Sequence, residues 1–124
     1  MSYLKSVNPV IEALEEHQID TAMVIRKRFM GREEMYLRFL KRFLEDENFG
    51  ILKEKLKMGD VKASFFAAHT LKGVLESLGL SPLMPSIFPM VEVLRKDSLQ
   101  GVEDLLIQAE QEYEEVRKIL ELQN

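Results

Sequence analysis

Cysteine is absent from this chain of 124 residues, which excludes disulfide bonds and thiolate metal sites. Long apolar runs are absent too, and every uninterrupted run is far shorter than the roughly 20 residues that a membrane span requires. Residues 1–5 lack the apolar stretch of a signal peptide. We therefore expect a cytoplasmic protein with no membrane segment.

Proline and glycine are also scarce, with four and six residues respectively. Most of the glycines fall at junctions, so most of the chain can be helical. No strand-like alternation of apolar and polar residues competes with this interpretation. With 46% hydrophobic and 31% charged residues, the composition is that of one globular domain spanning residues 1–124. We expect an all-α fold.

The formal net charge is -4, which disfavours nucleic acid as a partner. Positive charge is nevertheless concentrated between residues 26 and 42, whereas the C-terminal third is acidic. A solvated helix face is the simpler explanation. The alternative is a surface that steers an acidic partner. The basic residues of this segment are Arg26, Lys27, Arg28, Arg32, Arg38, Lys41 and Arg42.

Two short helices are expected at the N-terminal end. Asn8 is a suitable N-cap and Pro9 a suitable first helical residue. This helix should end near His17. A second one, capped within residues 19–21, should run to Gly31.

Residues 33–58 carry the strongest helical periodicity and predict a major bundle helix, with a possible kink or break at residues 48–50. Gly59 should end it, and Asp60 can cap the next helix over residues 61–78. That helix should stop at Gly79.

The last third of the chain is expected to be helical with one interruption. Ser81 and Pro82 can start a helix, but Pro89 predicts a break, with regular helix only over residues 90–96. A final long helix should begin at residue 99 or 102 and end at residue 122. The sequence thus predicts an antiparallel up-down four-helix bundle with one or two short additional N-terminal helices.

The helix over residues 61–78 carries the most informative motif. Its apolar stripe points away from His69, which should therefore face solvent. Lys72 and Gly73 follow at helical spacings that bring them beside the imidazole. A neutral imidazole is a nucleophile near pH 7, and an ammonium group would offset the charge of a phosphoryl group on it. A glycine inside a helix is unfavourable by roughly 1 kcal/mol, which close approach of another molecule would explain.

The motif His69-Thr70-Leu71-Lys72-Gly73, followed by Leu78-Gly79, resembles the signature of histidine-containing phosphotransfer (HPt) domains, which carry phosphoryl groups in two-component phosphorelays. The resemblance covers roughly residues 17–121. It implies that His69 accepts a phosphoryl group from a receiver-domain aspartate and passes it to a second receiver. It also implies that Lys72 lies beside the phosphoryl oxygens and that Gly73 leaves room for the partner.

Three further residues are candidates for partner docking. Phe65 and Phe66 flank the face that presents His69, so each ring could pack inside the bundle or form an apolar docking patch. Glu76 returns to the His69 face, where it could select partners, or it could form an ion pair with Lys72. In the related family this region usually carries small residues, and the following helix has few prolines.

No nucleotide-binding motif or cluster of metal ligands is present in the sequence. The resemblance implies that Mg²⁺ belongs to the partner receiver domain and that this chain needs no cofactor. His17 has no recognisable chemical neighbour, and we interpret it as an ordinary surface histidine.

The leading hypothesis is a stand-alone, monomeric phosphorelay carrier whose partners are response-regulator receiver domains and a hybrid histidine kinase. The principal alternative is a non-transferring adaptor that docks on a receiver domain or kinase. Two others remain open: an HPt domain of a larger sensor kinase, and an enzyme with autonomous kinase or hydrolase activity, which we do not expect.

Overall fold

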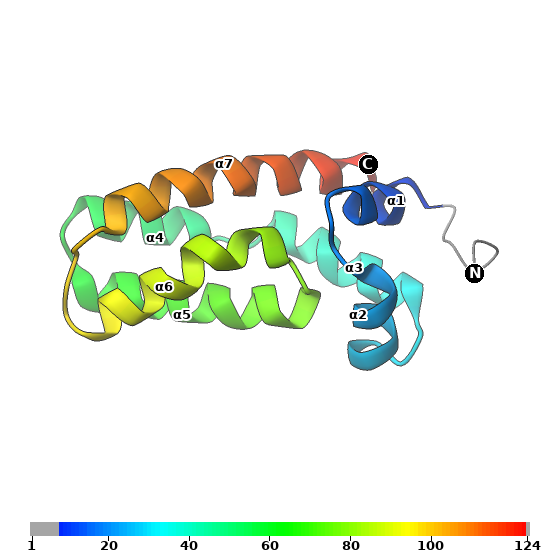
Figure 1. Cartoon of the computed structure of the whole chain (residues 1–124), viewed down its shortest axis with the longest axis horizontal. Coiled ribbons are helices and arrows are strands. Elements are labelled where there is room, and N and C mark those ends of the chain that lie inside the picture. Colours follow the sequence, from blue (N-terminus) through cyan, green and yellow to red (C-terminus); the bar gives the residue numbers. More distant parts are fainter. Residues whose placement is uncertain (1–7, 124) are drawn as a thin grey trace.

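The computed structural model describes residues 8–123, so the prediction about residues 1–5 lies outside the described residues. All regular structure in this range is helical, in agreement with the predicted all-α class. Two short helices precede a bundle of longer ones, and they lie at one end of it (Figure 1).

The two N-terminal helices are α1, Pro9–Glu16, and α2, Thr21–Arg28. The Asn8 side chain accepts hydrogen bonds from the backbone amides of the first turn of α1, as predicted for an N-cap. Asp20 caps α2 in the same way by accepting from the Met23 amide at 3.2 Å. Both short additional helices are therefore confirmed.

The predicted helix over residues 33–58 is instead two helices, α3 (Glu33–Leu44) and α4 (Asn48–Lys57). The chain turns at residues 45–47, just before the predicted weak point. The Asp46 carboxylate accepts hydrogen bonds from the Asn48 backbone amide at 2.8 Å and from its side-chain amide at 2.9 Å. Aspartate competes in this way for backbone amides that a continuous helix would use. The break that the sequence allowed at residues 48–50 is therefore present, but it lies at residues 45–47.

Helix α5, Val61–Leu78, has the predicted bounds. The Asp60 carboxylate accepts a hydrogen bond from the Ala63 amide at 3.0 Å. Gly79 ends the helix in the left-handed conformation, with φ of 68°. The buried residues of its middle turns include Ala68, Leu71 and Leu75, whereas Val74 is only partly buried.

Helix α6, Met84–Arg95, follows a short 3₁₀ turn at Ser81–Leu83 and contains Pro89 without a break. The predicted break at Pro89 was therefore wrong. Pro89 has no N–H to donate to the Pro85 carbonyl four residues before it. Both prolines are exposed, so water can hydrate this carbonyl and the helix continues. The opposite face holds the helix together through the buried residues Ser86, Ile87, Met90, Val91 and Leu94.

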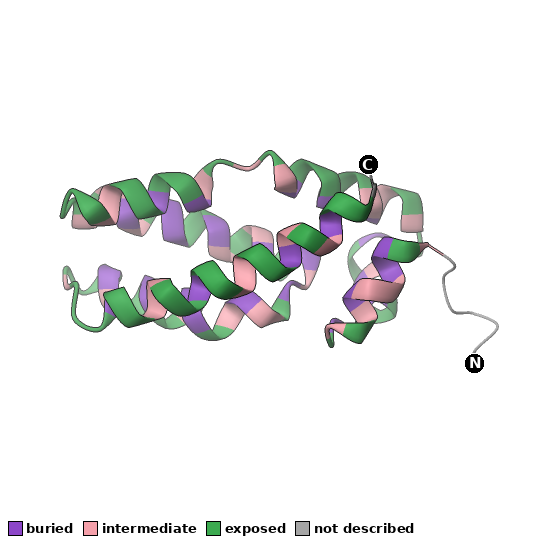
Figure 2. Ribbon diagram, turned by 90° about the horizontal axis from the view of Figure 1, so that it is seen from above, coloured by how far each residue is buried: buried purple, intermediate pink, exposed green. Residues whose placement is uncertain are grey.

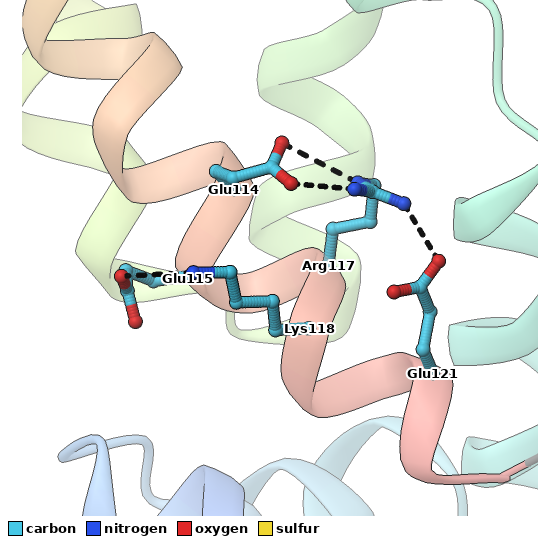
Figure 3. Close-up of polar contacts among 5 residues, drawn as sticks. All are labelled: Glu114, Glu115, Arg117, Lys118 and Glu121. Carbon is cyan, nitrogen blue, oxygen red and sulfur yellow. Dashed lines mark hydrogen bonds and ion pairs between the residues drawn. The ribbon is translucent and has the colours of Figure 1, made fainter.

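Helix α7, Val102–Leu120, completes the bundle and continues into a 3₁₀ turn at Glu121–Gln123. Its outer face carries surface ion pairs, among them Arg117 with Glu114 and Glu121 at 2.5 and 2.6 Å (Figure 3). The hydrogen bond from Arg117 lowers the pKa of Glu114. Exposed pairs of this kind contribute little to stability.

The bundle buries one continuous core. Helix α5 packs between α4 and α6, and α6 in turn packs against α7. Buried residues face the interior of the bundle and exposed residues cover its outside (Figure 2). Because α3 and α4 follow one another along the same side, they together form the first rod of the four-helix arrangement (Figure 1).

Candidate functional site

Helix α5 presents the candidate phospho-acceptor. Its buried stripe includes Ala68, Leu71 and Leu75, each at most 1% exposed. His69 lies on the other side of the helix and is exposed, as predicted. Because the helix is capped at both ends and packed on both flanks, it is a rigid platform for this imidazole.

The His69 ring has one neighbour of note. The centroid of the Phe65 ring lies 5.5 Å from its centroid, with the planes tilted by 30°. Within the described part of the chain, no hydrogen bond or ion pair engages either ring nitrogen. The imidazole thus has a ring neighbour, while its two nitrogen atoms have no partner among the described residues.

Lys72 and Glu76 lie on the same side of α5, but they form no ion pair with each other or with another described residue. The Lys72 ammonium lies over the ring of Phe88 from α6, 5.0 Å from the ring centroid. Glu76 is exposed. The predicted alternative of a Lys72–Glu76 ion pair is therefore not formed in this structure.

Gly73 opens the surface beside His69. A methyl group placed on it would meet no atom within 4 Å, so nothing in the fold requires a glycine there. A groove of about 750 Å³ adjoins it, between α5 and the pair α2–α3. The residues that line it include Arg28, Phe39, Arg42, Thr70, Gly73 and Ser77.

The groove wall combines apolar side chains with two arginines, Arg28 and Arg42, and one carboxylate, that of Asp46. Phe39 is 38% exposed and its ring lies against that of Phe29, at 5.5 Å between centroids. The Arg42 guanidinium lies over the Phe39 ring at 5.0 Å. Sequence analysis identified the basic segment, but only the packing of α2 and α3 beside α5 shows that Arg28 and Arg42 lie in the groove that Gly73 lines.

The family model described as the Hpt domain matches residues 34–119, which include the exposed His69, the whole of α4, α5 and α6, and all but one terminal residue of α3 and of α7. The chain belongs to the Hpt-domain family. The predicted resemblance over residues 17–121 is thus confirmed for its main part, whereas α1 and α2 lie outside the match. No curated protein and no solved structure gives a significant match to the chain.

The predicted docking residues are brought together only in part. Phe65 and Phe66 contact one another edge-on at 6.0 Å, but Phe65 is partly buried whereas Phe66 is 60% exposed. Arg95 of α6, which sequence analysis missed, lies over the Phe65 ring at 5.1 Å. No sequence pattern could have identified it, because the contact depends on the packing of α6 against α5.

The described part of the chain contains no candidate metal site. Residues 8–123 contain no group of three or more His, Cys, Asp or Glu side chains placed to hold a metal ion. His17 lies after α1, with its Nε2 3.6 Å from a Glu112 carboxylate oxygen of α7. Among the described helices, none is long and apolar enough to cross a membrane.

Proposed function

We propose that this Hpt domain is a phosphorelay carrier in which His69 accepts a phosphoryl group from the aspartyl phosphate of one receiver domain and donates it to another. The observation that carries the proposal is the exposed His69 imidazole, free at its nitrogen edge, beside the open surface at Gly73. A histidine used for structure would instead be expected to hydrogen-bond within the fold.

The transfer balances without an external acid or base. An unprotonated ring nitrogen, which we take to be Nε2, donates its lone pair to phosphorus. The bond between phosphorus and the aspartyl oxygen breaks, and the receiver's carboxylate leaves with that electron pair. The proton on the other ring nitrogen stays in place, and the reverse steps deliver the phosphoryl group to the second receiver's carboxylate.

Lys72 would stabilise the phosphorylated state. Its ammonium rests on the Phe88 ring, and a cation–π contact of this kind is worth about 0.5–1 kcal/mol at an exposed site. A charge-assisted hydrogen bond to a phosphoryl oxygen is stronger. We therefore expect the ammonium to move from Phe88 towards His69 when the phosphoryl group arrives.

The receiver would dock across the His69 face and the groove beside Gly73. Arg28 and Arg42 give the groove a positive wall that complements the acidic phosphorylation pocket of a receiver domain. The exposed Phe66 supplies an apolar contact, and Glu76, on the same face, would select among partners by repulsion. We do not assign Phe65 to this docking surface, because its side chain is partly buried.

The remaining properties follow from this function. We propose that Mg²⁺ is held by the partner receiver, that this chain needs no cofactor of its own, and that it has no autonomous kinase or phosphatase activity. The upstream partner would be a hybrid histidine kinase, and neither nucleic acid nor a membrane is a partner. A cytoplasmic monomer suits a carrier whose reactive face must stay open.

The test is phosphoryl transfer from a receiver domain already charged on its aspartate. Intact mass should rise by one acid-labile phosphoryl group in the unsubstituted protein and not in His69→Gln. Incubation with labelled ATP and no partner should leave the protein unlabelled. Binding of charged receivers without transfer would contradict the proposal and favour the non-transferring adaptor.

Glu76 offers a second test of the docking surface. Glu76→Ala removes the carboxylate without touching the core, so its effect should differ among receivers: transfer from the more acidic ones should rise. Equal rates for both proteins across several receivers would refute a selective role for Glu76.

A further inference from the structure

The Phe65 ring lies one helical turn before His69 on α5, a spacing that brings two side chains together on a helix surface. The two ring centroids are 5.5 Å apart and the ring planes are tilted by 30°, so the Phe65 ring is a direct neighbour of the imidazole. The lone pair of an imidazole nitrogen lies in the ring plane. A ring packed this close limits rotation of the imidazole, while no described residue hydrogen-bonds to its nitrogen atoms.

Phe65 is itself held by the neighbouring helix. The Arg95 guanidinium of α6 lies over its ring at 5.1 Å, and the Arg95 Nε is 3.3 Å from a Glu92 carboxylate oxygen. Phe65 also packs against the core as a partly buried side chain. A continuous set of contacts thus joins α6 to the imidazole through Phe65.

Phe66 is the natural comparison because it is the same residue type at the next position. Its side chain is 60% exposed and touches Phe65 edge-on at 6.0 Å. No ring contact joins it to His69 among the described residues. Phe65 can therefore restrict the orientation of the imidazole directly, whereas Phe66 cannot.

We propose that Phe65, anchored by Arg95, is a positioning residue that fixes the orientation of the His69 imidazole for attack on phosphorus. This inference rests on the proposed function. Attack requires the in-plane lone pair to point along the axis of the bond that breaks. Phe65 restricts the ring before the receiver binds, so less rotational freedom is lost on the way to the transition state.

The experiment compares Phe65→Leu with Phe66→Leu in transfer from a charged receiver domain, varying receiver concentration. Phe65→Leu should lower the maximal transfer rate by about tenfold with little change in the half-saturating concentration, since it misorients the nucleophile. Phe66→Leu should raise the half-saturating concentration and leave the maximal rate intact. Phe65→Tyr keeps the ring and should restore the rate.

A second measurement begins with the unsubstituted protein, so its main outcome does not depend on the folding of a variant. In the unsubstituted, unphosphorylated protein, nuclear Overhauser effects should connect the Phe65 and His69 ring protons, and the His69 ring should occupy one rotamer. Arg95→Gln should weaken these effects. Averaging of the His69 ring among several rotamers would overturn the proposal.

The kinetic outcomes separate this inference from the proposed function. If the unsubstituted protein accepts a phosphoryl group and Phe65→Leu changes only the half-saturating concentration, Phe65 is a docking residue and the positioning role is wrong. If the unsubstituted protein accepts none from any charged receiver, the proposed function fails, and the positioning role with it.

Discussion

At the scale of single residues, Gly73 is the most informative position. A larger side chain there should raise the stability of the protein and lower the rate of phosphoryl transfer. Nothing lies within 4 Å of a Cβ atom placed there, so Gly73→Leu should stabilise α5 by up to about 1 kcal/mol. It should also lower the rate of transfer from a charged receiver by about tenfold or more, because the added side chain blocks approach to His69. Urea unfolding and transfer kinetics measure the two effects.

Gly50 is the matched control for Gly73, since it also lies inside a helix and has open space around it. Gly50→Leu in α4 should give a similar gain in stability without a loss of transfer. Equal loss of transfer in both variants would show that helix rigidity, and not access to His69, explains the effect of Gly73→Leu.

Tyr36 allows a prediction about alkaline pH. Its buried hydroxyl donates a hydrogen bond to the Leu78 carbonyl at 3.0 Å, and burial raises its pKa above the ordinary value. Since the folded pKa exceeds the unfolded one, the unfolding free energy should fall as pH rises above about 10, where tyrosine ionises in the unfolded chain.

Tyr36→Phe should reduce this alkaline slope, with a remainder from Tyr113, whose pKa burial also raises. At neutral pH it should lower the unfolding free energy by about 1–2 kcal/mol through the lost hydrogen bond. Urea unfolding measured between pH 7 and about 11.5 tests both statements. An unchanged slope in Tyr36→Phe would mean that another group causes the alkaline loss.

At the scale of elements, the contact between the end of α5 and α2 allows a comparison of two glycines that share a left-handed backbone conformation but differ in their surroundings. Gly79 and Gly59 both have positive φ, at 68° and 74°. An added methyl group at Gly79 would overlap the buried side chain of Val24 in α2, whereas at Gly59 it would meet nothing within 4 Å. The two sites therefore separate backbone strain from packing.

Gly79→Ala should lower the unfolding free energy by about 2–4 kcal/mol, from left-handed strain and overpacking together. Gly59→Ala should lower it by only about 1–2 kcal/mol, from strain alone. Thermal or urea unfolding measures both losses. Adding Val24→Ala should recover part of the stability lost in Gly79→Ala and none of that lost in Gly59→Ala. Equal losses at the two glycines would show that α2 moves aside freely.

The same elements show how far the sequence could predict the structure. The bounds of α5 were predictable because local residues set them, with Asp60 at one end and Gly79 at the other. The exact position of the break after α3 was not predictable, because the Asp46 side chain sets it. The continuity of α6 was not predictable either, because it depends on the packing of the buried face. His69, Lys72 and Gly73 could be identified from their spacing, whereas Arg42 and Arg95 depend on which helices become neighbours.

At the scale of the whole molecule, charge is divided between surfaces. The net charge is -4, yet the groove beside Gly73 has Arg28 and Arg42 on its wall. At physiological salt the Debye length is about 8 Å, so a receiver senses the nearby groove more than the distant acidic face. Local charge should therefore govern docking despite the unfavourable total.

Arg42→Glu should lower the rate of transfer at subsaturating receiver by several-fold and weaken its dependence on salt, because electrostatic steering of the acidic pocket is lost. Lys118→Glu makes the same change in net charge on α7, where Lys118 pairs with Glu115 (Figure 3). It should alter the rate far less. Transfer rates between about 20 and 300 mM salt measure both effects, since the Debye length shortens severalfold over that range. Equal losses in the two variants would mean that total charge controls association, and the groove would then have no special part in recognising the receiver.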